Sequence, residues 1–545
     1  MDLPAAGPTA VALACAAEGG GELLQLGPAG APSGPPRPVP DVAAMVAEVE
    51  REAAPRWVLA DVAAGYPALV RAGVRIGRCH DVAATEALLL AVEGDHAGAA
   101  ALTVARAGAA EAATGQPALF EPAPATPRLS AQALSHAYAG QLERIARQRA
   151  ELPGLALLVA AESASCLAAA EMTQAGLPWS AQVHDQLLTE LLGARPPSAS
   201  ARPPALQSLA EEVTDILGEP GLNVDSQADV LRALRRAGLP VTSTRRHELR
   251  RHEHRVVEPF VRYRELARLH AAHGWAWREQ WVRDGRFHPE YVPGGVVSGR
   301  WATRGGGALQ IPKAVRAAVV APPGRLLVVA DAGQLEPRVL AALARDPGLV
   351  AATAEGDLYA ALAREALGRP EARREMKVAL LSAMYGGGAG SPALAALRRR
   401  FPAALALLED AARTGERGGS VRSVLGRTSP PPRPDWLSGL SDDAAAARSR
   451  AWGRFTRNFV VQASAADWAS VLVATLRQRL AGLAGQAELV FFQHDEVVVE
   501  AEERVAADAV RCVAEAGAEA TRLVLGDVGV HVPLDARAVS SYADR

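Results

Sequence analysis

The stretch from Arg325 to Arg338, RLLVVADAGQLEPR, constrains this chain more than any other. A Pro-Pro-Gly turn precedes the β-branched apolar run Leu326–Ala330, which is too short for a helix and is typical of a buried strand. The strand ends on a carboxylate, Asp331, and a turn then leads into a helix with Pro337 in its first turn. An acid at the end of a buried strand can serve chemistry or simply cap a helix, so Asp331 alone leaves both interpretations open.

A second stretch, Leu489 to Ala501, gives Asp331 a partner. Two strand-like apolar runs flank the sequence QHDE at 493–496, which predicts a tight β-hairpin with Asp495 and Glu496 at its turn. If this hairpin pairs beside the first strand, Asp331 and Asp495 meet at the end of the sheet. Two adjacent carboxylates repel each other, and the usual reason to build such a pair is to hold divalent cations, as in two-metal phosphoryl transfer.

A third stretch, from 373 to 386, predicts a helix with a mixed functional face. Four of its residues follow at intervals of four and share one side of the helix: Arg373, Lys377, Leu381 and Tyr385. A face that is positive at one end and aromatic at the other suits a triphosphate, a base and a sugar. The chain has only two lysines, which favours a specific role for Lys377 on a phosphate over that of an ordinary solvated lysine.

These stretches resemble the motifs of the DNA polymerase I family, family A. DAGQLEPR resembles the first palm motif, usually D-Y-S-Q-I-E-L-R; RREMKVALLSAMYG resembles the fingers motif R-x-x-x-K-x-x-x-F-x-x-x-Y-G; QHDE resembles the second palm motif H-D-E. Two further matches follow in the family's order: Ser298-Gly299-Arg300 continuing to Leu309-Gln310-Ile311-Pro312, and the series Arg454, Asn458, Gln462 and Asp467. The resemblance covers residues 155–545.

The resemblance implies a multidomain α/β fold, a right-hand polymerase with palm, fingers and thumb behind an amino-terminal ribonuclease-H-like domain of exonuclease type. The expected boundaries are a degenerate 3′–5′ exonuclease-like domain at 1–154, a thumb at 155–255, a first palm part at 256–340, fingers at 341–440, and a second palm part with the hairpin at 441–545.

The resemblance also implies template-directed DNA synthesis, in which dNTPs extend the primer 3′ end of a primer-template, in repair or replication gap filling. Asp331 and Asp495 are then ligands of two Mg²⁺ ions, for which Mn²⁺ can substitute, together with the backbone carbonyl of Ala332. Glu496 is a lesser acid of the same centre, and Lys377 donates a proton to the leaving pyrophosphate.

The remaining site residues divide between nucleotide and DNA. Glu336 and Tyr385 together close the space of a ribose 2′-OH, as a steric gate, and His494 touches the primer end. Nucleotide-binding residues are Arg373, Lys377, Leu381, Gln334 and those two gate residues. DNA-binding residues, several suited to the minor groove where every base pair shows acceptors, are Arg300, Arg338, Arg454, Asn458 and Gln462.

Five positions depart from the family pattern: Leu381 replaces the aromatic that stacks on the incoming base, Ala332-Gly333 replaces Tyr-Ser, Pro337 replaces an aliphatic residue, and Tyr359 replaces a histidine. Because base–aromatic stacking is worth about 1–3 kcal/mol, Leu381 is expected to weaken nucleotide binding roughly ten- to a hundred-fold without abolishing catalysis. The alternatives are a catalytically weak polymerase-fold protein that binds or scaffolds DNA, and a metal nuclease.

The first 150 residues resemble the exonuclease domain, with strands near Ala10–Ala14 and Trp57–Ala60, but the carboxylates that two metals need are missing. Only Glu18 lies near the first strand, and Leu142 replaces the acid of a Y-x-x-x-D motif that starts at Tyr138. Asp61 and Asp81 have ordinary explanations as a loop acid and a helix cap. We expect a scaffold without exonuclease activity.

The charge and composition of the chain bear on its partners, metals, disulfides and location. The net charge of −2 gives no global attraction to nucleic acid, but 232–255 holds eight arginines against two acids, either a DNA-binding patch or a solvated helical face. Four scattered cysteines without a C-x-x-C pair argue against zinc and disulfides. No apolar run approaches about 18 residues, so we expect no membrane span and no signal peptide. We expect a monomer in the bacterial cytoplasm, associated with the nucleoid.

Overall fold

The computed structural model describes residues 10–15, 19–114, 129–198, 201–304, 310–387, 391–483 and 485–545. They form two compact units. The first contains Met1–Gly176, Glu290–Arg304 and Pro323–Val539; the second contains Leu177–Pro289, Gly305–Pro322 and Ser540–Arg545. The unit that holds the expected thumb helices therefore begins later and ends later than 155–255. Glu18 and Leu309, named above, lie outside the described residues.

The amino-terminal part of the first unit is a five-stranded sheet in the order β3-β2-β1-β4-β5. β1 pairs antiparallel with β2 and parallel with β4, and β4 pairs parallel with β5, which is the topology expected of a ribonuclease-H-like domain. The strands are β1 (Ala10–Cys15), β2 (Gly21–Leu26), β3 (Arg37–Val39), β4 (Arg56–Leu59) and β5 (Arg78–Asp81). The helices are η1 (Pro28–Gly30), α1 (Val42–Ala53), α2 (Val62–Arg71), α3 (Val82–Glu93), α4 (His96–Thr114) and α5 (Ala131–Gln148).

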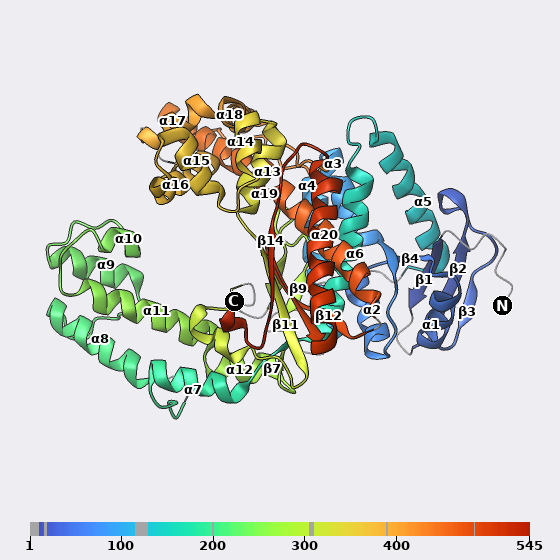
Figure 1. Cartoon of the computed structure of the whole chain (residues 1–545), viewed down its shortest axis with the longest axis horizontal. Helices are drawn as coiled ribbons and strands as arrows, with labels where there is room; N and C mark the ends of the chain where they lie inside the picture. The colour runs from blue at the N-terminus through green and yellow to red at the C-terminus, as the bar shows by residue number, and fades with distance from the viewer. Residues whose placement is uncertain are drawn as a thin grey trace. The chain divides into compact units, whose positions relative to one another are not determined.

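A second, antiparallel sheet in the order β12-β13-β11-β14 forms the palm. Its strands are β11 (Arg325–Ala332), β12 (Ala487–Gln493), β13 (Glu496–Glu502) and β14 (Leu534–Val539). The predicted strand and the predicted hairpin are both confirmed, and β13 pairs directly with β11. The apolar run of β11 is buried because helices pack on the sheet (Figure 1). Those helices are α6 (Leu155–Ala175), α19 (Asp442–Ala481) and α20 (Ala506–Leu525).

Helix α20 shows how the sequence sets this packing. Its small and apolar side chains recur at helical spacing and face the sheet, from Ala509 and Val513 to Ala516 and Ala520. At Gly517 the contact is closest, because an added β-carbon would lie 2.3 Å from Leu534 Cδ1 on β14. A short hairpin of β9 (Glu290–Val292) and β10 (Ala302–Arg304) lies in the same unit.

Helices between the two halves of the palm sheet form the fingers. They are α13 (Leu335–Ala344), α14 (Pro347–Ala352), α15 (Leu358–Leu367), η3 (Pro370–Ala372), α16 (Arg373–Tyr385), α17 (Pro392–Arg400) and α18 (Pro402–Glu416). Pro337 sits in the first turn of α13, as predicted, where its missing N–H costs nothing. The segment SPPPRP at 429–434 contains no helix, in keeping with its prolines. The 3-10 turn η4 (Glu503–Val505) joins β13 to α20.

The second unit is mostly helical and has its own apolar core. Its helices are α7 (Ala181–Leu192), α8 (Pro204–Leu217), α9 (Gln227–Arg236), α10 (Arg246–Leu249), α11 (Val257–His273), α12 (Trp275–Trp281), η2 (Lys313–Ala318) and η5 (Tyr542–Asp544). Three short strands complete it: β6 (Leu177–Pro178), β7 (Val282–Arg283) and β8 (Arg286–Phe287). Helix α9 is capped by a side chain, because the Asp229 N–H donates to Ser226 Oγ at 3.3 Å.

Two helices are long and apolar enough by length and composition to cross a membrane, although no uninterrupted apolar run was expected to reach that length. They are α6 and α19, and 72% and 83% of their most apolar windows are buried inside the protein. Both therefore pack as core helices of the first unit. All four cysteines are free thiols, in agreement with the expectation of no disulfide.

Candidate active site

The end of the palm sheet brings the predicted carboxylates together. Asp331 pairs across the sheet with Glu496, and the Ala332 N–H donates to the Asp495 backbone oxygen at 3.0 Å. Asp495 therefore lies in the turn beside the last residues of β11. Burial and the neighbouring charge of Asp331 raise the pKa of Asp495 to about 7. Two half-buried acids thus lie close together at this end of the sheet.

The hairpin turn itself is tight. The Asp495 N–H donates to the Gln493 carbonyl oxygen at 2.7 Å, and His494 between them has φ of 56°. This hydrogen bond across three residues defines a γ-turn, which is strained for a residue with a β-carbon. Burial and the nearby Arg300 charge lower the pKa of His494. The predicted primer-end residue is therefore held in one orientation beside Asp495.

The residues of this centre fit hard divalent cations. The raised pKa of Asp495 shows that its anionic form lacks compensation, and an oxygen-seeking cation would supply it. Within the described ranges no group of three or more His, Cys, Asp or Glu forms a metal site by itself. That is consistent with Mg²⁺, which is usually bound by one or two carboxylates plus substrate phosphates rather than by an all-protein cage.

A polar network joins the palm to the fingers beside the carboxylates. Arg300, in the loop before β10, forms an ion pair with Glu336 on α13, and the Tyr385 hydroxyl at the end of α16 donates to the same carboxylate. Burial and this carboxylate raise the pKa of Tyr385. The structure thus brings together the two residues of the predicted steric gate, and it adds Arg300 as their partner.

Helix α16 presents the predicted face. Arg373, Lys377 and Tyr385 are exposed and Leu381 is half-buried. The opposite side of the helix is packed in the fingers by Met376, Ala379, Leu380, Ala383 and Met384. The four predicted residues therefore lie on the accessible side of the helix, where a nucleotide could reach them.

Two residues that the sequence analysis did not assign hold the cations of this face. Arg373 forms an ion pair with Asp357, and the Arg373 guanidinium and the Lys377 ammonium each lie 5.8 Å from the centre of the Tyr359 ring. Tyr359 is 5% exposed, so the ring is a fixed support. The sequence showed Asp357 as a possible helix cap, but it did not show that Asp357 pairs with Arg373.

Gln334 supports the same corner from inside the protein. Its side-chain nitrogen donates to Asp357 Oδ1 at 3.1 Å, and its side-chain oxygen accepts from the Leu358 N–H at 2.8 Å. Its backbone is left-handed, with φ of 60°. Gln334 was predicted to bind nucleotide, but here its amide is occupied in holding the start of α15 and, through Asp357, the position of Arg373.

Arg338 is a correction to the predicted DNA-binding set. Its side chain is fully buried, and its guanidinium donates to backbone oxygens at 2.8 Å on Gly333, 2.8 Å on His531, 3.0 Å on Glu355 and 3.1 Å on Gly356. A guanidinium whose donors are spent on buried carbonyls has none left for a phosphate or a base edge. Arg338 therefore fixes the backbone around α13.

The predicted minor-groove residues on α19 stand in one row. Arg454 is exposed, whereas Asn458 and Gln462 are half-buried, and their side-chain amides make no hydrogen bond with any residue that the structure describes. Arg454 packs on the end of α16, since a β-carbon added at Gly386 would lie 2.5 Å from Arg454 Cγ. Asp467, the last residue of that motif, is fully buried and pairs with Arg427.

The two candidate acids of the amino-terminal domain, Asp61 and Asp81, serve as helix caps beside an arginine. Asp61 and Asp81 both cap helices, so Asp61 is not the loop acid that was expected, and both are buried. Arg106 lies 3.7 Å from Asp81 Oδ2. Burial and the charge of Asp81 raise the pKa of Asp61 to about 6, while Arg106 opposes the rise. An arginine thus occupies the neighbourhood where a nuclease would need cations.

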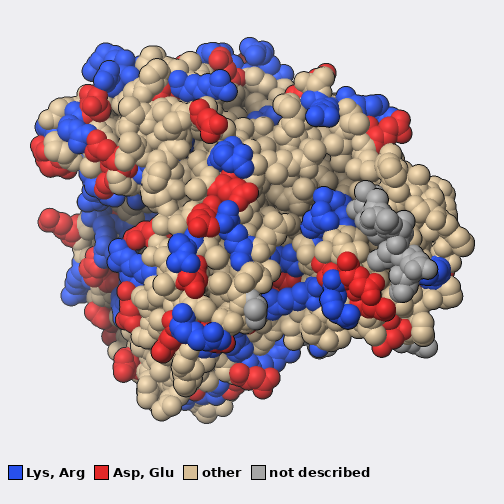
Figure 2. Space-filling view, turned by 45° about the vertical axis from the view of Figure 1, so that its right-hand side comes forward, with Lys and Arg blue, Asp and Glu red and all other residues tan. Residues whose placement is uncertain are grey.

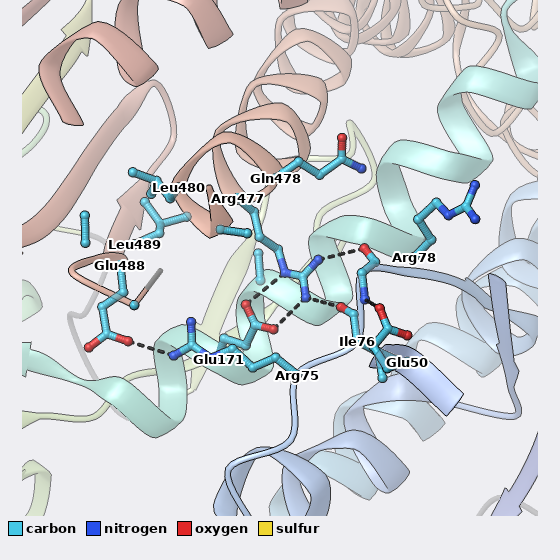
Figure 3. Close-up of a pocket in the computed structure, with 15 residues that line it drawn as sticks. Glu50, Arg75, Ile76, Arg78, Glu171, Arg477, Gln478, Leu480, Glu488 and Leu489 are labelled. Carbon is cyan, nitrogen blue, oxygen red and sulfur yellow. Dashed lines mark hydrogen bonds and ion pairs between the residues drawn. The ribbon is translucent and has the colours of Figure 1, made fainter. Parts of the chain in front are cut away.

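A cavity of about 710 Å³ lies between the amino-terminal domain, α6, α19 and β12, and its lining contains none of the predicted site residues (Figure 3). Its charges are paired with one another. Arg477 donates to both Glu171 oxygens, at 2.8 and 2.7 Å, and Arg75 pairs with Glu488 at 2.7 Å. The ion pairs join the amino-terminal domain to the palm, so this region is a structural joint.

The basic segment of the second unit is partly compensated. Arg232, Arg236, Arg246 and Arg250 each form an ion pair with a nearby acid. Half of the eight arginines in 232–255 are therefore engaged in ion pairs within the protein, and Arg235 also donates through Nε to the Val241 carbonyl oxygen at 2.9 Å. On the face drawn in Figure 2, basic and acidic side chains are interspersed, in keeping with the small net charge.

Comparisons with known proteins agree with this geometry. The family model described as DNA polymerase family A matches residues 200–542. The chain is 27% identical over 311 residues to DNA polymerase I of Chloroflexus aurantiacus, covering 52% of this chain and 32% of that protein. It is 28% identical over 353 residues to the thermostable DNA polymerase I of Thermus thermophilus, covering 55% of this chain and 40% of that protein.

A solved structure is similar over nearly the whole chain. It is the polymerase domain of Pol1 from M. smegmatis in complex with a DNA primer-template and dNTP, with a TM-score of 0.70 and 20% sequence identity. The similarity covers 98% of this chain and 95% of that one. The right-hand fold expected from the sequence is therefore confirmed, whereas the chain spans well under half the length of the two curated relatives.

Proposed function

Because this chain belongs to DNA polymerase family A, we propose that it is a template-directed DNA polymerase that adds dNTPs to a primer 3′ end and releases pyrophosphate. The observation that supports this most is the pair of half-buried carboxylates Asp331 and Asp495 at the end of the palm sheet, in the same unit as a helix with an accessible cationic face. A pure scaffold has no physical need for that pair.

Asp331 and Asp495 would hold two Mg²⁺ ions, or Mn²⁺ in their place, with the Ala332 carbonyl as a further ligand and Glu496 as a nearby acid. When bound, such ions lower the pKa of the primer 3′-OH and neutralise charge on the phosphates. The chain's own contribution is to place these oxygens rigidly, through the β11–β13 register and the γ-turn at His494.

Arg373 and Lys377 would bind the triphosphate, Arg373 as a planar fork and Lys377 as a compact ammonium that gives a proton to the leaving pyrophosphate. To reach the phosphates Arg373 would exchange Asp357 for them, while Tyr359 keeps both side chains near their place. Glu336 and Tyr385 would exclude a ribose 2′-OH, and Leu381 would pack on the base.

DNA would be held without sequence preference. Arg300, Arg454, Asn458 and Gln462 would donate to the acceptors that every base pair shows in the minor groove, and His494 would touch the primer end. The second unit would contact duplex phosphates. We place the activity in repair or replication gap filling, by a monomer in the bacterial cytoplasm.

We also propose that the amino-terminal domain has no 3′–5′ exonuclease activity. Its buried acids, Asp61 and Asp81, already serve as helix caps, and Arg106 provides their counter-charge. A nuclease site of this kind needs carboxylates that are free to take cations. The domain would act as a scaffold for the palm.

A primer-extension assay with Mg²⁺ or Mn²⁺ and all four dNTPs tests the proposal, with Asp495→Asn as the matched inactive variant. We expect extension by the wild type and none by the variant, with primer-template affinity nearly unchanged because arginines and amides hold the DNA. Specific primer-template binding without extension under both metals would favour the alternative, a polymerase-fold scaffold, for which the departures at Leu381 and Ala332-Gly333 are the motivation.

A further inference from the structure

The loop that presents Arg300 to the active site is tight but poorly anchored at its own tip. It joins β9 to β10. Its backbone hydrogen bonds are all local: Gly295 N–H to the Val292 carbonyl at 3.1 Å, Val296 N–H to the Arg300 carbonyl at 3.1 Å and Gly299 N–H to the Val296 carbonyl at 2.7 Å. Val296 and Val297 at the tip are 43% and 55% exposed. The position of the turn must therefore be fixed by what lies beneath it.

Beneath the loop lies a buried charge cluster built from three distant segments. Arg427, which follows α18, pairs through Nη2 with Glu162 Oε2 on α6 at 2.9 Å and through Nε with Asp467 Oδ1 on α19 at 3.3 Å. The three side chains are 8%, 4% and 0% exposed. Arg427 is itself held by its own backbone, since its N–H donates to Ser423 Oγ at 2.9 Å.

The loop lies directly on this cluster through two glycines. A β-carbon at Gly299, the residue before Arg300, would lie 2.3 Å from Arg427 Nε, and one at Gly294 would lie 2.2 Å from Glu162 Oε1. Both glycines have positive φ, 83° and 64°, which side chains with a β-carbon rarely adopt. The Arg427 guanidinium thus occupies the space that a side chain at Gly299 would need, and it sets the position and orientation of the turn.

Burying three charges for stability alone is a poor solution, because the cost of removing them from water offsets most of their attraction. Such a cluster does give a single, rigid geometry. We propose that Arg427 is a positioning residue, which fixes the turn at Gly299 so that the Arg300 guanidinium lies beside Glu336 and the carboxylate pair. The inference rests on the proposed polymerase activity, in which Arg300 tests the base pair at the primer end.

Loss of Arg427 should mainly affect the discrimination between matched and mismatched primer ends. Loss of Arg427 leaves the ligands of the metal site and the cationic face of α16 in place, but it lets the Arg300 loop move. Extension from a matched primer end then falls modestly, whereas discrimination against a mismatched primer end falls to the level of a variant without Arg300. Arg427→Lys keeps one charge and reaches one acid, so it should restore part of the loss.

The test compares Arg427→Gln, Arg427→Lys, Arg300→Ala and the double variant Arg300→Ala/Arg427→Gln in matched and mismatched primer extension. Arg422→Gln is the control, since Arg422 is in the same segment but half-exposed, with only a long ion pair to Glu151 at 4.0 Å. We expect Arg427→Gln to lose about tenfold in discrimination and the double variant to be no worse than Arg300→Ala, which is the signature of coupled residues. Additive losses would overturn the proposal.

Hydrogen exchange of the amides in 293–301 gives a measurement that does not depend on activity. We expect faster exchange at Val296 and Gly299 in Arg427→Gln, unchanged exchange in β11 and β13, and no change in Arg422→Gln. If Arg427→Gln does not fold, Arg427→Lys replaces it in both measurements. Unchanged exchange in a folded variant would refute the positioning role. If the wild type never extends primers, the proposed function fails while this measurement still decides the role of Arg427.

Discussion

Replacing Leu381 by phenylalanine should improve nucleotide binding. Leu381 stands on the accessible side of α16, one turn from Lys377 and one turn from Tyr385, and it is half-buried. The neighbouring packed positions are Leu380 and Met384, so a ring at 381 enlarges the nucleotide-facing surface without entering the fingers core. The perturbation therefore adds a flat π-face where the incoming base is expected.

The magnitude follows from what leucine already supplies. Stacking of a base on an aromatic ring is worth about 1–3 kcal/mol, but leucine retains the apolar contact and the surroundings have been shaped for it. A net gain of about 1 kcal/mol remains, which corresponds to about a fivefold lower KM for dNTPs. Affinity for primer-template should not change, because other residues hold the DNA.

Steady-state single-nucleotide incorporation measures this, with primer-template affinity determined separately. Val378→Phe is the matched control: Val378 is on the same helix, 60% exposed, and faces a groove with Glu371, Arg374 and Ser382 rather than the site. A folded Leu381→Phe with an unchanged KM would show that this face of α16 does not meet the base. An equal effect in Val378→Phe would show that the gain is not specific to the site.

Three further outcomes are expected. Glu336→Ala should raise rNTP incorporation relative to dNTP by removing the acid that Tyr385 and Arg300 hold in place, and an unchanged ratio would make Glu336 a purely structural acid. The wild type should not degrade single-stranded or mismatched 3′ ends, and metal-dependent degradation that persists in Asp495→Asn would place a nuclease site in the amino-terminal domain. Asp61→Asn should keep the helix cap but remove a buried ionisation. Because the folded pKa of Asp61 is raised to about 6 from an ordinary 3.8, its stabilising protonated form is fully present below about pH 4 and lost as pH rises through 6. At pH 8 the variant should therefore be more stable than the wild type by at most about 3 kcal/mol, seen as a higher unfolding temperature, and this difference should shrink towards pH 4. A difference that is independent of pH would contradict the assignment.

The local elements of the candidate site were predictable because their signals are local. A short β-branched run between turns specified β11, two such runs around a polar tip specified the β12–β13 hairpin, and an interval of four specified the exposed face of α16. Each depends only on residues within one stretch, and the burial of one face enforces the register. The proximity of Asp331 and Asp495 could be predicted from one assumption, that the hairpin pairs beside the strand that ends at Asp331.

Contacts between segments that are far apart in the sequence could not be deduced in this way. Arg338 looked like a DNA-binding arginine from its motif, yet the surrounding carbonyls of Thr353, Glu355 and His531 consume its donors. Asp357 gave only a capping signal, and its pairing with Arg373 became visible when α15 and α16 packed side by side.

The charge cluster at Arg427 shows the same limit most clearly. Its three members are far apart in the chain, none belongs to a periodic pattern around the others, and the glycines that rest on it look like ordinary loop residues. Sequence by itself determined which elements form and which chemistry-bearing residues they present, because propensity and periodicity act within a few turns or strands. Only the tertiary structure decided which of those side chains are free to act and which are consumed by neighbours, since burial and hydrogen-bond satisfaction depend on contacts across the whole unit.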